Sequence, residues 1–203
     1  GLMIVARTRR AMDALVAMIA QREVHREYLA VAYRKWVGAP VRDVVAAIGR
    51  DYKNRLRMAV VDLERLPGKE AHTTFECLSS QEDACLVQCI LHTGRTHQIR
   101  VHMAENKTPV VGDQKYGMKT DKSKELMLHS SRLQLIHPFN KDVFSIESPE
   151  RQLSLEVSAA SPRTGSSGLK RIALAEIGLN CPVTTRPIPG GLHVFRRRDF
   201  LQW

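Results

Sequence analysis

The sequence predicts an α+β protein with a largely antiparallel central sheet flanked by helices and followed by a basic C-terminal extension. Short runs rich in β-branched and apolar residues alternate with turn residues, only two segments before residue 157 combine helical spacing with a cap residue, and the composition changes after that point. Strands joined by short turns pair as antiparallel neighbours. We therefore expect one main domain over residues 1–157, then a linker and tail over residues 158–203.

The first elements are a strand and a capped helix. Residues 2–6 form an apolar run that is typical of a buried strand, and the chain opens with it directly, as a fragment would. Thr8 is a suitable N-cap for a helix that we expect to end near Arg22. Its apolar positions recur at helical spacing, at Ala11, Leu15, Met18 and Ile19.

Further strands are expected along most of the remaining domain, over residues 26–32, 43–48, 57–61, 71–78, 84–91, 127–136 and 143–146. The strands at 57–61 and 71–78 surround the turn Pro67-Gly68-Lys69, which predicts a strand meander there. Residues 137–140 read as another turn.

The most informative stretch is the ten-residue run Thr-Gly-Arg-Thr-His-Gln-Ile-Arg-Val-His at residues 93–102. Gly94 permits a sharp turn, and Thr96 is a suitable N-cap for a helix that ends near Asn106. Free amides at a helix start together with Arg95 and Arg100 predict a phosphate-binding site. The alternative is a strand-turn-helix corner whose arginines are only solvated.

The charge favours a polyanionic partner. The chain has 31 Lys and Arg against 21 acids, a net charge of +10 and a pI near 9.8, although basic proteins do not all bind nucleic acid. From residue 160 onward there are seven Lys and Arg against two acids, including Arg196, Arg197 and Arg198. We expect this tail to bind RNA or a ribonucleoprotein surface, such as a ribosomal particle.

Several classes of protein and site are excluded. No apolar run approaches the roughly 20 residues that cross a bilayer, which predicts a soluble protein without a membrane partner. The four cysteines lack metal or disulfide spacing, and His97 and His102 lie on different faces of a helix, so no metal is expected. A reducing compartment, cytoplasm or mitochondrial matrix, fits these thiols.

The run at 93–102 continues into Pro-Val-Val-Gly-Asp at 109–113 and Tyr116-Gly117, and the whole resembles the third signature of the RluA-type RNA pseudouridine synthases. Other landmarks of that family recur in order, at residues 1–6, 26–30, 57–58, 68–73, 128–129, 135 and 137–138. The resemblance covers residues 1–157.

The resemblance implies an enzyme that flips a uridine out of RNA, attacks the nucleotide with an aspartate, and rejoins the rotated base through a carbon atom, without a cofactor. The RNA would be ribosomal or transfer RNA. By resemblance, Arg100 pairs with the catalytic aspartate, Tyr28 stacks on the target base and Ile99 supplies an apolar wall. A core tyrosine and a solvent-facing arginine are the alternatives for Tyr28 and Arg100. Contacts to RNA are expected from Lys69, Arg95, His97 and Lys115, with shaping of the turn as the alternative for Arg95 and His97.

The sequence departs from the family at the nucleophile. That aspartate lies in a segment like His-Arg-Leu-Asp, and no aspartate in these 203 residues has this setting; Asp113 reads as a structural cap. Two interpretations stay open: an enzyme whose aspartate lies upstream of Gly1, or a catalytically inactive RNA-binding protein that assists ribosome assembly, for example in mitochondria. An unrelated basic structural protein is a third. We expect the 203-residue chain alone to form no pseudouridine.

Overall fold

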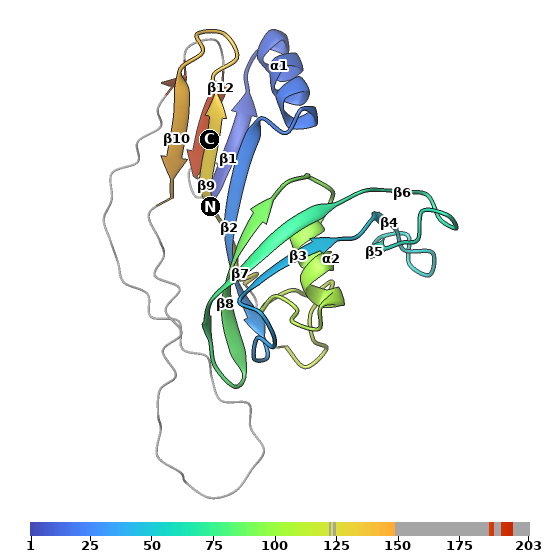
Figure 1. Cartoon of the computed structure of the whole chain (residues 1–203). Helices are drawn as coiled ribbons and strands as arrows, with labels where there is room; N and C mark the ends of the chain where they lie inside the picture. Colours follow the sequence, from blue (N-terminus) through green and yellow to red (C-terminus); the bar gives the residue numbers. More distant parts are fainter. Residues whose placement is uncertain (122, 124, 149–186, 189–191, 197–203) are drawn as a thin grey trace, which may run out of the picture.

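The centre of the molecule is a six-stranded antiparallel sheet, seen in the computed structural model of Figure 1, which describes residues 1–121, 123, 125–148, 187–188 and 192–196. The strand order is β10-β9-β2-β8-β7-β3. The six strands are β2 (Val24–Tyr33), β3 (Val41–Val45), β7 (His72–Ser80), β8 (Ala84–Leu91), β9 (Leu128–Ile136) and β10 (Val143–Glu147). The predicted α+β class with a largely antiparallel sheet is therefore confirmed.

One face of this sheet packs against α2 (Gln98–Glu105). Side chains alternate between the two faces, as strand geometry requires. On β7, Thr73 and Phe75 point into the core and are 0% exposed, whereas Glu76 faces solvent. The core under α2 includes Ala30, Ala32, Trp36, Phe75, Cys85, Val87, Cys89, Ile99, Met103 and Val110.

A second sheet brings together segments from both ends of the sequence. Strand β1 (Leu2–Ala6) pairs antiparallel with β12 (Leu192–Arg196), which also pairs with β11 (Pro187–Ile188). Leu192 is fully buried in the core that α1 (Arg9–Ala20) covers. Part of the predicted extension thus contributes strands beside β1, and the domain boundary after residue 157 stays a prediction. The predicted linker lies outside the described residues.

Three short strands form an arm that projects from the central sheet to the right in Figure 1. They are β4 (Ile48–Arg50), β5 (Met58–Val60) and β6 (Gly68–Lys69), in the order β5-β4-β6. Two predictions were wrong here. Residues 43–48 are divided between β3 and β4, because the chain stays beside β7 only as far as the Ala46 amide, which bonds the Ala71 carbonyl, whereas Ile48 pairs with Val60 and Lys69. The expected meander is absent among the described strands because Gly68–Lys69 pairs with β4 instead of forming a turn.

The two helix starts differ in how they are capped. The Thr8 hydroxyl accepts a hydrogen bond from the Ala11 amide at 3.2 Å, which confirms the predicted cap of α1. The prediction that Thr96 caps α2 was wrong, because α2 begins after His97, whose backbone is left-handed with φ 57°. The Gln98 side chain, not Thr96, bonds the Arg95 amide there, at 2.9 Å.

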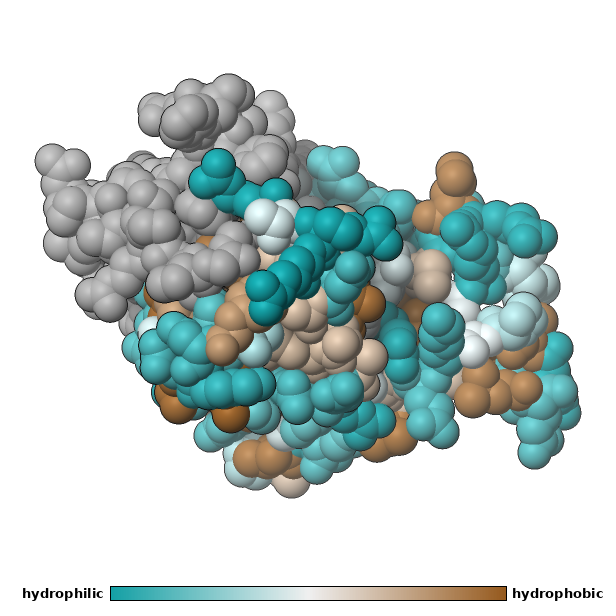
Figure 2. Space-filling view, turned by 90° about the horizontal axis from the view of Figure 1, so that it is seen from above, coloured by the Kyte–Doolittle hydropathy of each residue, from teal (hydrophilic) through white to brown (hydrophobic). Residues whose placement is uncertain are grey.

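Figure 2 shows, among the described residues seen from above, more hydrophilic than hydrophobic surface, with the most hydrophobic residues in separate groups. Among the described helices, neither is long and apolar enough to cross a membrane.

Candidate active site

The turn that joins β8 to α2 is built around a buried glutamine. Gln98 is 3% exposed, and its Oε1 accepts hydrogen bonds from the Thr93 hydroxyl at 2.7 Å and the Arg95 amide at 2.9 Å. Its Nε2 donates to the His72 carbonyl and the Thr73 hydroxyl, both at 2.9 Å. A buried amide with all of these partners fixes the start of α2 on the end of the sheet. Much of the ten-residue run at 93–102 therefore holds in place the corner where β8 turns into α2.

Gly94 serves a different purpose from the expected sharp turn. Its φ is not in the left-handed region, but a Cβ at this position would lie 2.7 Å from Nη1 of Arg26. The absence of a side chain at Gly94 leaves room for a guanidinium that lies against the backbone here. The structure thus adds Arg26, from β2, to the cations at this corner.

Arg100 projects from α2 to the carboxylate of Asp113. Nε donates to Oδ2 at 2.8 Å and Nη2 to Oδ1 at 2.7 Å, which is the two-point geometry that an arginine and a carboxylate favour. Asp113 is 2% exposed, and its Oδ1 also accepts from the amides of Lys115 and Tyr116, both at 2.9 Å. The predicted cap role of Asp113 agrees with these bonds, whereas its pairing with Arg100 was missed.

The ion pair keeps both groups charged. Burial by itself raises the pKa of Asp113, but hydrogen bonds from Arg100 and from the amides of Tyr116 and Lys115 outweigh burial and lower it below its ordinary value. The hydrogen bond to Asp113 raises the pKa of Arg100. The corner therefore holds a permanent guanidinium in a partly buried setting.

Tyr116 organises the surroundings of this guanidinium. Its ring lies beneath Arg100, with the guanidinium carbon 5.0 Å from the ring centroid. Its hydroxyl lies 2.8 Å from Nδ1 of His97 and accepts the Met58 amide at 3.0 Å, so it joins α2 to the arm. Burial first, and then the charges of Arg100 and Lys115, lower the pKa of His97, which favours a neutral imidazole at pH 7. The spacing Gly-Asp-x-x-Tyr at 112–116 was the sequence signal for this group.

Tyr28 and Ile99 lie in the same hydrophobic cluster. Tyr28 is half-buried on β2 and packs against the core under α2, where Ile99 is 5% exposed. Tyr28 is paired with Cys89, so its side chain projects from the sheet face that α2 covers. The aromatic ring of Tyr28 thus comes from the sheet, and the apolar Ile99 and the cationic Arg100 come from the helix packed on it.

The predicted RNA-binding residues have different surroundings. Arg95 is half-buried, and its Nε donates to the Glu70 carbonyl at 2.8 Å. Lys69 is exposed on the arm, and Lys115 donates to the Leu56 carbonyl at 3.0 Å. Arg196 ends β12, whereas Arg197 and Arg198 lie outside the described residues.

An open cavity of about 650 Å³ lies elsewhere, between the end of α1 and the strands β9 and β10. Its lining includes Arg22, His25, Gln134 and Lys141, and none of the predicted site residues belongs to it.

Comparison with known families identifies the class of protein in which this strand-turn-helix corner occurs. A family model described as RNA pseudouridylate synthase matches residues 1–105, which include β2, the corner and α2. The chain belongs to the RNA pseudouridylate synthase family. Within that family its relatives support the RluA type.

Two similar pseudouridine synthases come from bacteria. The ribosomal large subunit pseudouridine synthase D of Xanthomonas campestris is 38% identical over 163 residues, 73% of this chain and 47% of the relative. The protein of the same name from Xylella fastidiosa is 41% identical over 152 residues, 68% of this chain and 44% of the relative. The chain thus spans about half the length of the curated synthases it matches.

A solved structure of this family has the same fold. Human RNA pseudouridylate synthase domain containing 1 superposes with a TM-score of 0.62 at 25% identity, covering 80% of this chain and 69% of the other.

Proposed function

We propose that this chain is part of an RluA-type RNA pseudouridine synthase, which isomerises uridine to pseudouridine in structured RNA. The observation that carries the proposal is the placement of Arg100 in carboxylate-binding geometry on the same helix as Ile99, which packs with Tyr28. The relatives named ribosomal large subunit pseudouridine synthase support ribosomal RNA as the substrate, with transfer RNA as the other candidate.

Each residue has a role in the proposed reaction. Flipping a base out of the RNA costs a few kcal/mol, and stacking on the half-buried Tyr28 ring offsets part of that. Ile99, which is 5% exposed, would supply an apolar wall beside the flipped base and exclude water from it. Arg100 keeps the attacking carboxylate ionised, because an adjacent positive charge favours the charged form of an acid. Among the described residues no acceptor bonds its Nη1, which is available to a second carboxylate.

RNA binding is proposed for the basic surface around this corner and for the tail. Lys69 is exposed on the arm, and Arg95, His97 and Lys115 lie around the start of α2, so a phosphate backbone that crosses the corner would meet all four. Arg196, Arg197 and Arg198 would add sequence-independent contacts to RNA or to a ribosomal particle.

A second candidate is a catalytically inactive RNA-binding protein that assists ribosome assembly. It is favoured by one observation: Arg100 already holds a carboxylate, Asp113, and this pair is complete without a nucleophile.

The test compares the complete protein encoded by the gene with an Arg100→Met variant. The measurement is tritium release from large-subunit ribosomal RNA labelled on the uracil carbon that forms the new glycosidic bond. We expect release by the unaltered protein and none by the variant, while Arg9→Met, which removes an exposed arginine on α1, leaves the rate unchanged. RNA binding without release by the complete protein would instead support the second candidate. The 203-residue chain alone should release no tritium.

A further inference from the structure

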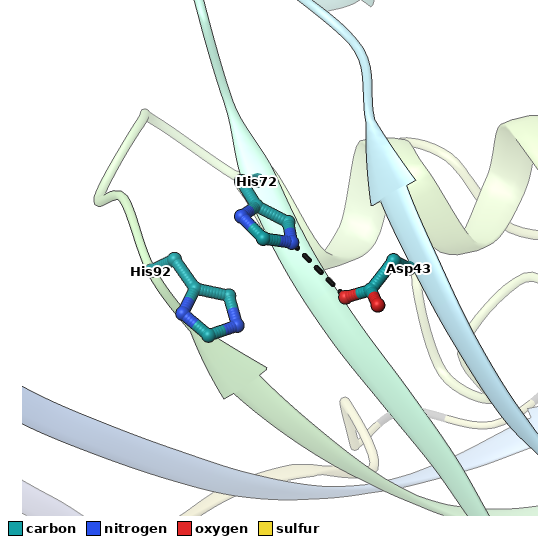
Figure 3. A group of neighbouring side chains, drawn as sticks. All are labelled: Asp43, His72 and His92. Atoms are coloured by element: carbon teal, nitrogen blue, oxygen red, sulfur yellow. Dashed lines mark hydrogen bonds and ion pairs between the residues drawn. The ribbon is translucent and has the colours of Figure 1, made fainter.

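The sheet face opposite Tyr28 carries a group of three side chains from neighbouring strands. Asp43 lies on the edge strand β3, His72 begins β7 and His92 follows β8 (Figure 3). Asp43 is paired with Thr74, and the His92 amide bonds the His72 carbonyl, so the register places all of them on one face. Thr73 and Phe75, on the other face, are fully buried.

The polar atoms of this group converge. One ligand atom from each of Asp43, His72 and His92 lies within 4.8 Å of the other two. His72 Nε2 is 3.0 Å from Asp43 Oδ1, and the imidazoles of His72 and His92 are stacked with centroids 4.1 Å apart. The Thr74 hydroxyl donates to Asp43 Oδ1 at 2.5 Å and lies 2.8 Å from Nε2 of His92. A hydroxyl has one proton, so in this hydrogen bond it accepts the proton of His92 Nε2, and metal binding through Nε2 requires the other tautomer of the imidazole.

The protonation states suit a cation. Burial, and then the proximity of His72, lower the pKa of His92, which favours a neutral imidazole at pH 7. Hydrogen bonds from Thr74 and then His72 lower the pKa of Asp43, which favours the carboxylate. Ligand nitrogens must be free of protons and carboxylates ionised for a metal to bind.

We propose that Asp43, His72 and His92 bind a divalent transition metal ion of the zinc class, with water in the remaining position. Two imidazoles and one carboxylate match the nitrogen and oxygen ligands that zinc accepts, whereas magnesium and calcium prefer oxygen ligands alone. The site is missed in the sequence because its ligands come from three strands without metal-binding spacing. The proposal therefore differs from the expectation that no metal would bind, which rested on the spacing of the cysteines and of His97 and His102.

The surroundings set the strength of this site. Arg22 and His25 contribute to lowering the pKa of His92, so positive charge lies nearby and opposes a cation. Asp43 is also largely exposed, with 61% of its side chain accessible. We therefore expect weaker binding than at a buried zinc site with cysteine ligands.

Binding would connect the edge of the sheet to the candidate active site. Strand β3 would be joined through the metal to β7 and to the end of β8. The His72 amide donates to the Thr93 hydroxyl at 2.9 Å, so the same ligands lie beside the corner that precedes α2. The proposal does not depend on the pseudouridine synthase activity, because its readout is binding of the metal alone.

The test is titration of the purified chain with Zn²⁺ by calorimetry and with Co²⁺ by visible absorption. We expect one ion per chain, and about tenfold or greater loss of affinity in each of Asp43→Asn, His72→Ala and His92→Ala. His25→Ala and Glu76→Gln, which alter exposed residues beside the site, should retain it. Affinity should fall at acidic pH, because a protonated imidazole of His92 cannot bind a metal.

Three outcomes would overturn the proposal. They are no binding of either ion, unchanged binding by the three variants, and a thiolate charge-transfer band with Co²⁺, which would assign the ion to cysteines. Circular dichroism of each variant separates loss of the site from loss of the fold. Zn²⁺ should also raise the Tm of the unaltered chain and leave that of His92→Ala unchanged, since a ligand stabilises only the state that binds it.

Discussion

The guanidinium of Arg100 and the carboxylate of Asp113 are joined at two points, 2.8 and 2.7 Å, and this pair fixes α2 to the turn that contains Tyr116. Asp113 also accepts two amides of its own turn. One buried carboxylate therefore both closes a turn and sets the position of the cation at the candidate active site.

Asp113→Asn should destabilise the fold by about 1.5–3 kcal/mol, because a partly buried guanidinium loses its charged acceptor. Urea unfolding measures this change, and Asp13→Asn, at an exposed pair on α1, should alter stability by less than about 0.5 kcal/mol. Equal small effects at both positions would contradict a structural role for the Arg100–Asp113 pair.

The pH dependence of stability should reveal the same carboxylate. The pKa of Asp113 is lower in the folded chain than its ordinary value of 3.8, so its contribution is complete above that value and disappears as pH falls through the folded pKa. Urea unfolding between about pH 5 and pH 2 should show a steeper decline for the unaltered chain than for Asp113→Asn. Parallel curves would show that Asp113 titrates normally.

Two glycines should respond differently to alanine. Gly112 has φ +77°, and a Cβ there would meet the Glu125 carbonyl oxygen at 1.7 Å, so Gly112→Ala should cost more than about 1 kcal/mol. At Gly94 the new atom meets only the movable end of Arg26, and Gly94→Ala should cost less than about 0.5 kcal/mol. Thermal unfolding compares them, and a large destabilisation at Gly94 would mean that the Arg26 guanidinium cannot move.

Tyr28→Leu in the complete protein should reduce turnover much more than RNA affinity, because the leucine keeps the apolar packing of β2 but cannot stack on a flipped base. Single-turnover rates and filter binding measure the two effects. Tyr52→Leu, at a tyrosine that is 71% exposed on the arm loop, serves as the matched control for turnover. Equal reductions of rate and affinity from Tyr28→Leu would identify it as a core residue.

Removing the arginines of the tail should make RNA binding less dependent on salt. Changing Arg196, Arg197 and Arg198 to Ala should flatten the slope of log affinity against log salt by about 0.7–0.9 for each RNA phosphate that the tail no longer neutralises. The control removes three exposed cations elsewhere, Arg9, Lys35 and Lys119. An unchanged slope in the tail variant would indicate that the tail binds protein.

Features with local causes could be predicted from the sequence. The strand at residues 84–91 was predicted with its observed bounds, because its apolar and β-branched residues are consecutive. The Thr8 cap was also correct, since it depends on atoms three residues apart. The run at 93–102 indicated the family because it concentrates many family-specific residues in one place.

Only the tertiary structure determined which residues far apart in the sequence become partners. The start of α2 has no side-chain cap from Thr96, and the buried Gln98 side chain instead holds the preceding turn through the Arg95 amide, with partners on β7 that no local pattern reveals. Gly68–Lys69 is a strand because β4, formed by residues 48–50, lies beside it. The pairing of Arg100 with Asp113, and the meeting of Asp43 with His72 and His92, likewise depend on which strands and turns the fold places together. Local periodicity contains no information about these partners, because long-range pairing is determined by the packing of the whole core.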